Sequence, residues 1–387
     1  MIDLAATEDL LAGEGASPAF VPRRLVALDV FRGITVAGMI LVNDPGSWSS
    51  IYWPLKHATW NGWTPTDLVF PFFLFIVGVS MAFSLDQRRA EGAARERLFW
   101  HILRRAAIIF AIGLFLNGYP YFQLHRIRYL GVLQRIAICY LYAGAVYLWT
   151  SRRKRAAVIA ALLAAYWLLM TQITVPYYGK GHLDPEGNFA AFVDRYWLVQ
   201  HMWKPMWDPE GIVSSIPAIG STLLGTFAGE CLRSSRTAST KLRVLILAGL
   251  CGLIAGEIMN HWLPINKNLW TSSFTVFTAG FASMMLAVCY WLLEIKNWRR
   301  WAKPFVIFGM NPMAAFFISM FLAKNLGLWK IRGPGESPVT LWHFIYSGIF
   351  LPFASPINAS LLFALAYVGF CLLLVWLLYR REIFIKI

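Results

Sequence analysis

Two long apolar runs, LVALDVFRGITVAGMILVN at residues 25–43 and DLVFPFFLFIVGVSMAFSL at residues 67–85, are joined by the polar stretch DPGSWSSIYWPLKHATWNGWTPT at residues 44–66. An α-helix rises 1.5 Å per residue, so about 20 apolar residues can cross the hydrocarbon core of a bilayer. Because hydrocarbon offers no partner for backbone N–H and C=O groups, such runs fold as helices. The sequence therefore predicts two membrane-spanning helices with a polar connection between them.

The apolar character continues through the whole chain, whose 387 residues are 58% hydrophobic and 14% charged. A soluble protein would carry about 25% charged residues. We therefore predict an all-α, polytopic membrane bundle of about ten spanning helices, forming a single domain over residues 23–387. The expected spans lie near residues 25–43, 67–85, 101–117, 129–149, 156–175, 214–232, 244–263, 271–293, 304–323 and 359–379.

The positive charges of the chain indicate its orientation. The net charge is +15, and most Lys and Arg residues fall in the loops on one side of the ten-span arrangement. The positive-inside rule then places both termini in the cytoplasm and residues 44–66 and 176–213 on the external face. An eleventh span at residues 341–352 would move the final Arg380 and Arg381 outside. We therefore expect this short segment to be re-entrant or interfacial.

Three further expectations concern the N-terminal residues, nucleic-acid binding and metal binding. Residues 1–22 lack the basic start and apolar core of a signal peptide and are expected to form a disordered cytoplasmic tail. The basic residues sit in short loops without an aromatic module beside them, so nucleic acid is not an expected partner. The histidines show no metal-ligand spacing, so no metal site is predicted.

Polar residues inside the expected spans are candidates for binding an anionic group. Asp29 and Arg32 lie three residues apart on one helix face. Arg32 either locks helix packing through an ion pair or faces a cavity that admits an anionic group from the cytosol. Arg135 either joins Arg32 in holding phosphates or pairs structurally. Asn311 precedes Pro312, which frees a backbone carbonyl and can kink a helix.

His57 is the candidate catalytic base. Imidazole is the natural general base near neutral pH. Trp60 belongs to a set of tryptophans that can exclude water from it, and Asn43 and Asn61 can orient or polarise a substrate. A loop histidine is often only a polar surface residue, and spacing alone leaves both interpretations open.

Several ordered motifs together resemble the heparan-alpha-glucosaminide N-acetyltransferase family, and the match covers nearly the whole chain after residue 23. They are LDVFRG at 28–33, KHATWNGWT at 56–64, DLVFP at 67–71, GVLQRIA at 131–137, DPEG at 208–211, INKNLWT at 265–271 and NPMA at 311–314.

The resemblance implies an acetyl-CoA-dependent enzyme that acetylates an amino sugar on the far side of a membrane. The active-site histidine of the family falls on His57 and its companion asparagine on Asn43. The expected partners are coenzyme A, an amino sugar and membrane lipids, and a homodimer stays open. The donor-binding candidates are Arg32, Arg135 and Asn311, and the acceptor-binding candidates are Asp67, Asn61, Trp60 and Lys267. Asp67 either binds the sugar or orients His57.

The resemblance is strongest to bacterial relatives associated with glucosamine and N-acetylglucosamine use. The large lumenal domain of the lysosomal enzyme has no counterpart before the first span, so we expect a small amino sugar and a bacterial inner membrane. Two rival functions stay open: a sugar permease and an O-acetyltransferase of a surface glycan. A permease is disfavoured because no inverted repeat of broken helices is evident. Direct transfer and an acetyl-histidine intermediate are both compatible with the sequence.

Overall fold

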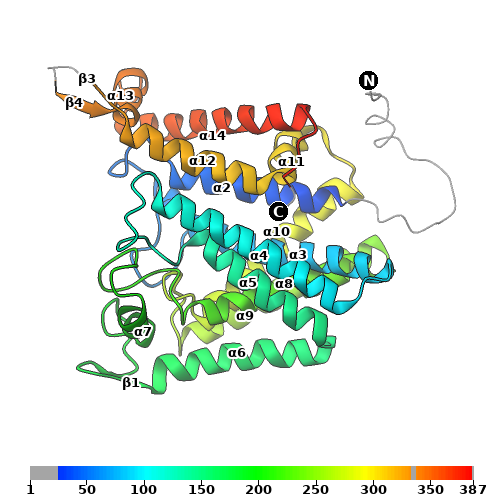
Figure 1. The fold of residues 1–387 in the computed structure, drawn as a ribbon. Coiled ribbons are helices and arrows are strands. Elements are labelled where there is room, and N and C mark those ends of the chain that lie inside the picture. Colours follow the sequence, from blue (N-terminus) through cyan, green and yellow to red (C-terminus); the bar gives the residue numbers. More distant parts are fainter. Residues whose placement is uncertain (1–24, 333–336, 386–387) are drawn as a thin grey trace.

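The computed structural model describes residues 25–332 and 337–385, and the expected tail at residues 1–22 lies outside them. Long helices lie side by side and form one bundle (Figure 1). They are α2 (Val26–Asn43), α3 (Val69–Ala90), α4 (Arg95–Gly118), α5 (Val132–Trp149), α6 (Arg152–Gln172), α8 (Ser215–Arg233), α9 (Ala238–Asn260), α10 (Ser272–Tyr290), α11 (Lys303–Met310), α12 (Pro312–Leu328) and α14 (Pro356–Arg380). All ten predicted spans are helical, which confirms the all-α membrane fold.

The number of helices that can span a membrane on their own is smaller than ten. Within the described residues, eight helices are long and apolar enough, or nine if α11 and α12 together count as one span. The helix α8 is not among them, although it has 19 residues. It is rich in Gly, Ser and Thr, and most of its side chains are buried against other helices. A helix surrounded by protein needs less apolar surface than one that faces lipid.

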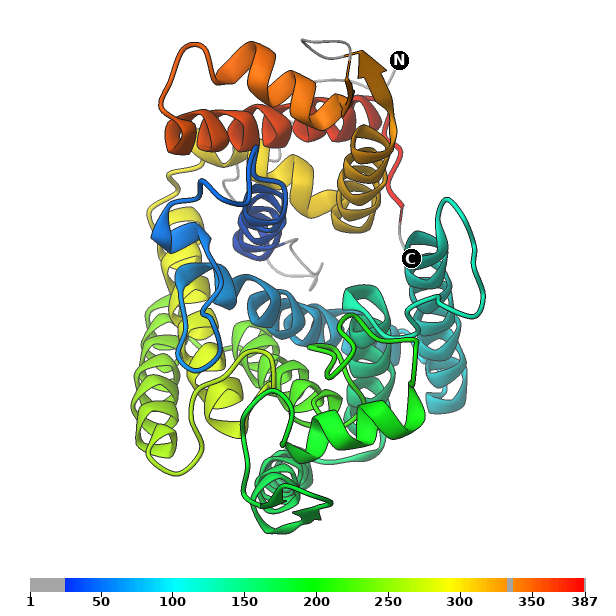
Figure 2. The ribbon, with the colours of Figure 1, turned by 90° about the vertical axis from the view of Figure 1, so that its left-hand side faces the viewer.

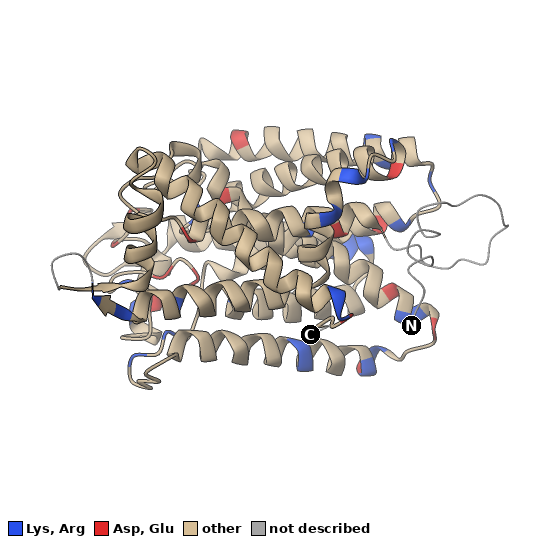
Figure 3. Cartoon of the chain, turned by 90° about the horizontal axis from the view of Figure 1, so that it is seen from above, with Lys and Arg blue, Asp and Glu red and all other residues tan. Residues whose placement is uncertain are grey.

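The charges are distributed as a membrane bundle requires. Many of the charged residues lie towards the two ends of the helices, and long stretches between the ends carry none (Figure 3). A charge at the centre of a bilayer is costly, so this pattern fits helices that cross hydrocarbon.

Glycines bring α3 and α8 into direct backbone contact. A Cβ atom added to Gly225 would lie 2.0 Å from the carbonyl oxygen of Phe75, and one added to Gly229 would lie 2.7 Å from that of Val79. The small-xxx-small pattern at 225–229 therefore allows α3 and α8 to approach closely, as this pattern commonly does between membrane helices.

Gly225→Val is expected to destabilise the bundle by more than the roughly 1–3 kcal/mol of ordinary overpacking, because the obstacle is backbone and cannot rotate away. Thermal unfolding in detergent measures the effect. The matched control is Gly369→Val on α14, where an added Cβ would have nothing within 4 Å. Equal melting temperatures for the two variants would contradict the close contact.

The expected span at 304–323 is broken at Asn311, directly before Pro312, where the sequence predicts that the helix can kink. The helices α11 and α12 meet at 77°. Asn311 between them leaves the helical conformation, with φ −127° and ψ 52°. Pro312 has no N–H to continue the helix and suits the first position of the next one. Asn311 is fully buried, and its amide donates to the carbonyl of Ile383 and accepts from the N–H of Ile385.

One end of the bundle carries the long connections. We call it the loop end and define it by residues 44–66 and 176–213, which face the viewer in Figure 2. The second connection contributes to a hairpin of β1 (Thr174–Val175) and β2 (Gly179–Lys180) and contains the helix α7 (Phe189–Trp197). Asn188 caps α7 by accepting a hydrogen bond from the N–H of Ala191.

The segment at residues 341–352 forms two short helical turns. The hairpin of β3 (Lys330–Arg332) and β4 (Pro338–Thr340) leads into α13 (Leu341–Ile345) and the π-helical turn η5 (Tyr346–Phe350). Both are too short to cross a bilayer, so the segment is not a continuous eleventh span.

Candidate active site

A short 3-10 turn at the start of the second span holds the carboxylate of Asp67. This turn, η2, covers Pro65–Leu68 and begins after Thr64. Proline suits the first position of a helical turn, and an acidic residue at the third can accept from the cap. The Asp67 side chain accepts from the N–H of Thr64 and from that of Ala58, each at 3.0 Å. The carboxylate, 1% exposed, is therefore fixed in place.

The other oxygen of this carboxylate binds the imidazole of His57. Asp67 Oδ1 lies 2.6 Å from His57 Nδ1. With the carboxylate ionised, Nδ1–H donates to it and Nε2 keeps its lone pair. The side chain of His57 is 43% exposed, so Nε2 is open to a substrate. The pair is a histidine oriented by a buried carboxylate, which is the arrangement a general base requires.

Lys267 completes the charge balance around Asp67. Its Nζ lies 3.4 Å from Asp67 Oδ1 and 3.0 Å from His57 Nδ1. With the Nδ1 proton assigned to the hydrogen bond with Asp67, the ammonium group pairs with the carboxylate. Burial lowers the pKa of Lys267, and the charges of Asp67 and Glu210 oppose this shift. Lys267 thus helps to keep Asp67 ionised.

Lys267 reaches the site because two distant loops pair with each other. The N–H of Gly62 donates to the carbonyl of Ile265 at 2.7 Å, and Gly62 and Asn266 form a single parallel β-bridge. The side chain of Asn266 donates to that of Asn61 at 3.1 Å. Asn61 therefore holds the His57 loop against the loop that carries Lys267.

Trp60 connects the same site to the long connection at 176–213. Its indole N–H donates to the carbonyl of Leu183 at 2.8 Å, and its ring meets that of Trp207 edge to face at 5.1 Å between centroids. The two tryptophans give the site an aromatic wall, the kind of surface on which the apolar face of a sugar packs.

A second group of charges lies beside the wall, and the sequence interpretation missed it. The DPEG turn at 208–211 presents Asp208 and Glu210 to the guanidinium of Arg128, with Nε 2.9 Å from Asp208 Oδ2. Glu210 also acts electrostatically on Lys267, so the turn is close to the His57 site. The signal in the sequence that could have found this group is the pair of acidic side chains, Asp208 and Glu210, in one loop.

The structure places Arg135 at this turn. It is fully buried, donates from Nη2 to the carbonyl of Gly211 at 3.3 Å and to Ser214, and lies over the ring of Trp270. Its Nε and Nη1 have no hydrogen-bond partner within the described part of the chain. Arg135 therefore supports the loop end.

Arg32 has different neighbours. Its guanidinium donates to Ser80 Oγ at 2.6 Å, to the carbonyl of Gly309 at 3.0 Å and to Asp29 at 3.2 Å. Arg32 thus connects α2 to α3 and to the end of α11, next to the break at Asn311. The structure thus brings Arg32 and Asn311 to one region and does not bring Arg135 to it.

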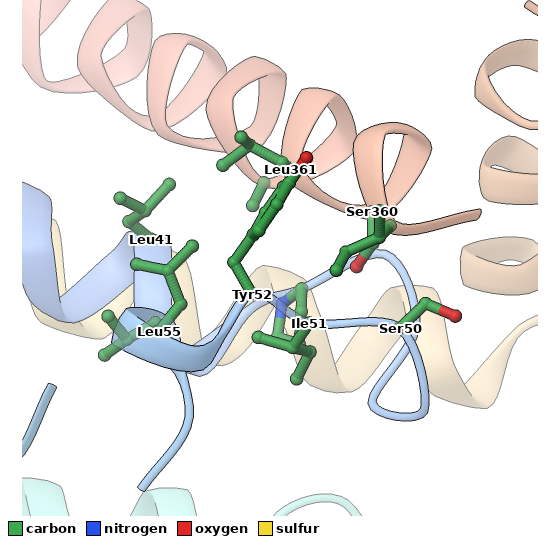
Figure 4. A pocket seen from close by; sticks show the side chains of 11 residues that line it. Leu41, Ser50, Ile51, Tyr52, Leu55, Ser360 and Leu361 are labelled. Carbon is green, nitrogen blue, oxygen red and sulfur yellow. The ribbon is translucent and has the colours of Figure 1, made fainter. Parts of the chain in front are cut away.

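Asn43 ends α2 and is exposed. Its side chain makes no hydrogen bond among the described residues, to His57 or to any other group. The residues that follow it pack on α14, where Tyr52 donates to Asn358 at 2.5 Å. Figure 4 shows Tyr52 and Ile51 beside Leu361 around a cavity of about 10 Å³, room for roughly one water molecule. This packing fixes the start of the polar stretch.

Asp194 on α7 positions the DPEG turn. Its carboxylate is buried, accepts from the N–H of Ile212 at 2.9 Å and leaves no room for a side chain at Gly211. Burial raises the pKa of Asp194 to about 7, although the Ile212 hydrogen bond opposes the rise.

This raised pKa predicts a pH dependence of stability. Between about pH 4 and 7 the folded protein keeps the proton on Asp194, whereas the unfolded chain has lost it. Unfolding then releases a proton, so stability falls as pH rises through this window and is flat above it. Asp194→Asn is expected to remove this part of the slope in melting temperature against pH. The exposed Asp184→Asn is the control, and an unchanged slope in Asp194→Asn would contradict the assignment.

Comparisons with known proteins show which proteins this sequence is similar to. A family model described as "Heparan-alpha-glucosaminide N-acetyltransferase, catalytic" matches residues 24–256. The heparan-alpha-glucosaminide N-acetyltransferase of Homo sapiens is 29% identical over 353 residues, which cover 76% of this chain and 52% of that protein. The Mus musculus protein of the same name is 27% identical over 350 residues, covering 76% and 53%. The chain spans about half the length of these curated relatives.

Proposed function

Because the chain belongs to the heparan-alpha-glucosaminide N-acetyltransferase family, we propose that it moves an acetyl group from cytosolic acetyl-CoA to the amine of an external amino sugar such as glucosamine. The loop end is then external, and both termini are cytoplasmic, in a bacterial inner membrane. The observation that carries the proposal is the exposed His57 held by the buried carboxylate of Asp67.

His57 acts on the acceptor. The sugar binds with its amine in the neutral form, near Nε2 of His57. As the nitrogen attacks the acetyl carbonyl, Nε2 takes the proton that the nitrogen loses, and Asp67 stabilises the resulting imidazolium. A new C–N bond forms, the C–S bond breaks, and the proton on His57 returns to the thiolate leaving group.

Asn43 is proposed to stabilise the negative charge that develops on the carbonyl oxygen. Its side-chain amide is exposed and is not engaged elsewhere in the described part of the chain, so its N–H groups are free to donate. Removing such a donor typically costs about 10²-fold or more in rate.

The residues at the opposite end of the bundle fit a polyanionic donor. Acetyl-CoA supplies the activated acetyl group and carries phosphates. Arg89 and Arg105 each bury an Nε that lacks a hydrogen-bond partner among the described residues. Together with Arg32 they are proposed to bind these phosphates, since guanidinium groups suit phosphate oxygens. Arg135 is not proposed for this role.

The acceptor is proposed to lie between the His57 loop and the long connection. Trp60 supplies an apolar face, and Glu210 and Lys267 supply charge near His57. Asn61 acts indirectly, by holding the two loops together. Asp67 is assigned to orienting His57, because both of its oxygens are occupied by protein donors.

Proteoliposomes loaded with acetyl-CoA test the proposal. External glucosamine should be acetylated and stay outside, as measured by mass spectrometry of the medium and the lumen. Uptake of the sugar without acetylation, unaffected by His57→Ala, would instead identify a permease. A parallel assay with sugars that offer only hydroxyl groups separates N-acetylation from O-acetylation. Radiolabelled acetyl trapped on His57 without acceptor would contradict direct transfer.

A further inference from the structure

A cavity of about 220 Å³ lies between α8, α9 and α10, and none of the residues around His57 lines it. Its walls are apolar and include Leu224, Phe227, Leu245, Ala248 and Val276. It exists because α9 packs closely on α10, where Gly252 meets the backbone of Gly280, and leaves a gap beside α8. Two lining residues, Arg152 at the start of α6 and Cys231 near the end of α8, place one end of the cavity at the end of the bundle opposite the loop end.

Arg152 is the charged residue that lines this cavity. Its side chain is 63% exposed and lies over the ring of Phe227. It approaches Glu230 only at 3.7 Å, since the other oxygen of Glu230 binds Arg155. Its guanidinium is therefore available to a further anion.

Two further basic residues, Arg236 directly after α8 and Lys241 at the start of α9, follow the lining residue Cys231 in the sequence. The charges of Arg236, Lys241 and Arg152 all act on Cys231, a lining residue at the end of α8. The result is an apolar cavity with a positively charged entrance. A ligand that matches both parts has an apolar chain and an anionic head.

We propose that this cavity binds an anionic phospholipid, with one acyl chain between α8, α9 and α10 and the phosphate on Arg152. The proposed topology places the entrance at the cytoplasmic leaflet, whose anionic lipids attract basic residues near the membrane surface. The acyl chain enters the cavity from the lipid-facing side of the bundle, past the exposed Ala248. The bound lipid fills the gap between α8 and α9 and joins them.

Native mass spectrometry of the full-length protein tests this site. The protein is incubated with phosphatidylglycerol or with phosphatidylcholine of the same chain length. The native chain should retain phosphatidylglycerol preferentially. Arg152→Gln should lower this retention about fivefold, the effect of one basic residue near a charged membrane surface. Ala248→Phe, which blocks the cavity from an exposed position, should abolish it.

Arg153→Gln is the matched control, since Arg153 is adjacent and exposed but does not line the cavity. It should retain the lipid as the native chain does. Equal retention of the two lipids by the native chain, or unchanged retention in Ala248→Phe, would overturn the proposal. Acetyl-CoA binding, measured by calorimetry, should be the same in all variants. If Ala248→Phe lost acetyl-CoA binding, the cavity would belong to the donor and the lipid proposal would fail.

Discussion

His57→Ala is expected to lower the rate of acetyl transfer by about 10²-fold to 10⁴-fold, the usual contribution of a positioned general base. The ring is 43% exposed, so its removal leaves no large void and the protein should stay folded. The neutral form of the amine can still bind, but no group accepts its proton as the new bond forms. The loss should therefore appear in kcat, measured in proteoliposomes, more than in the KM for the sugar.

The control for this variant is His343→Ala. His343 lies on α13 and is exposed, and its backbone N–H and C=O groups make hydrogen bonds to Thr340 and Ser347. The His343→Ala variant should transfer acetyl at the native rate. If His57→Ala retained native kcat while unfolding at the native temperature, His57 would not be the base.

Asp67→Asn is expected to lower kcat by roughly 10²-fold to 10⁴-fold, about as much as His57→Ala does. The reason is that the substitution reverses the direction of the hydrogen bond to the imidazole. The amide oxygen can still accept from the N–H groups of Ala58 and Thr64. Its NH₂ group then faces His57 Nδ1 and donates to it, which moves the ring proton to Nε2. His57 stays in place but no longer presents a lone pair to the amine.

Two comparisons separate this mechanism from simple misfolding. Asp184→Asn, at an exposed aspartate in a second DPEG sequence at residues 184–187, should leave kcat unchanged. The double variant His57→Ala, Asp67→Asn should be little slower than His57→Ala alone, because Asp67 acts through the ring. If the two losses multiplied in the double variant, Asp67 would have a separate role such as binding the sugar.

The helical bundle could be predicted from the sequence because the cause is local. Each apolar run satisfies its own backbone hydrogen bonds, so its length and composition suffice to identify a helix. The helix α7 was missed because nine residues in a polar connection carry little periodic signal, although Asn188 was a usable cap. The break at Asn311 was foreseeable from Pro312, but the 77° angle depends on packing against neighbouring helices.

The candidate site, like the fold, could be predicted from the sequence only in part. The sequence motifs by themselves identified His57, Asn43, Asp67 and Lys267 as candidates, and the apolar runs determined a membrane bundle. Only the tertiary structure decided that Lys267 reaches Asp67, that Glu210 acts electrostatically on Lys267, and that Arg135 lies apart from Arg32. The physical reason is that a helix forms from contacts within its own segment, whereas the meeting of Asp67 with a side chain 200 positions away depends on the packing of α3 against α10.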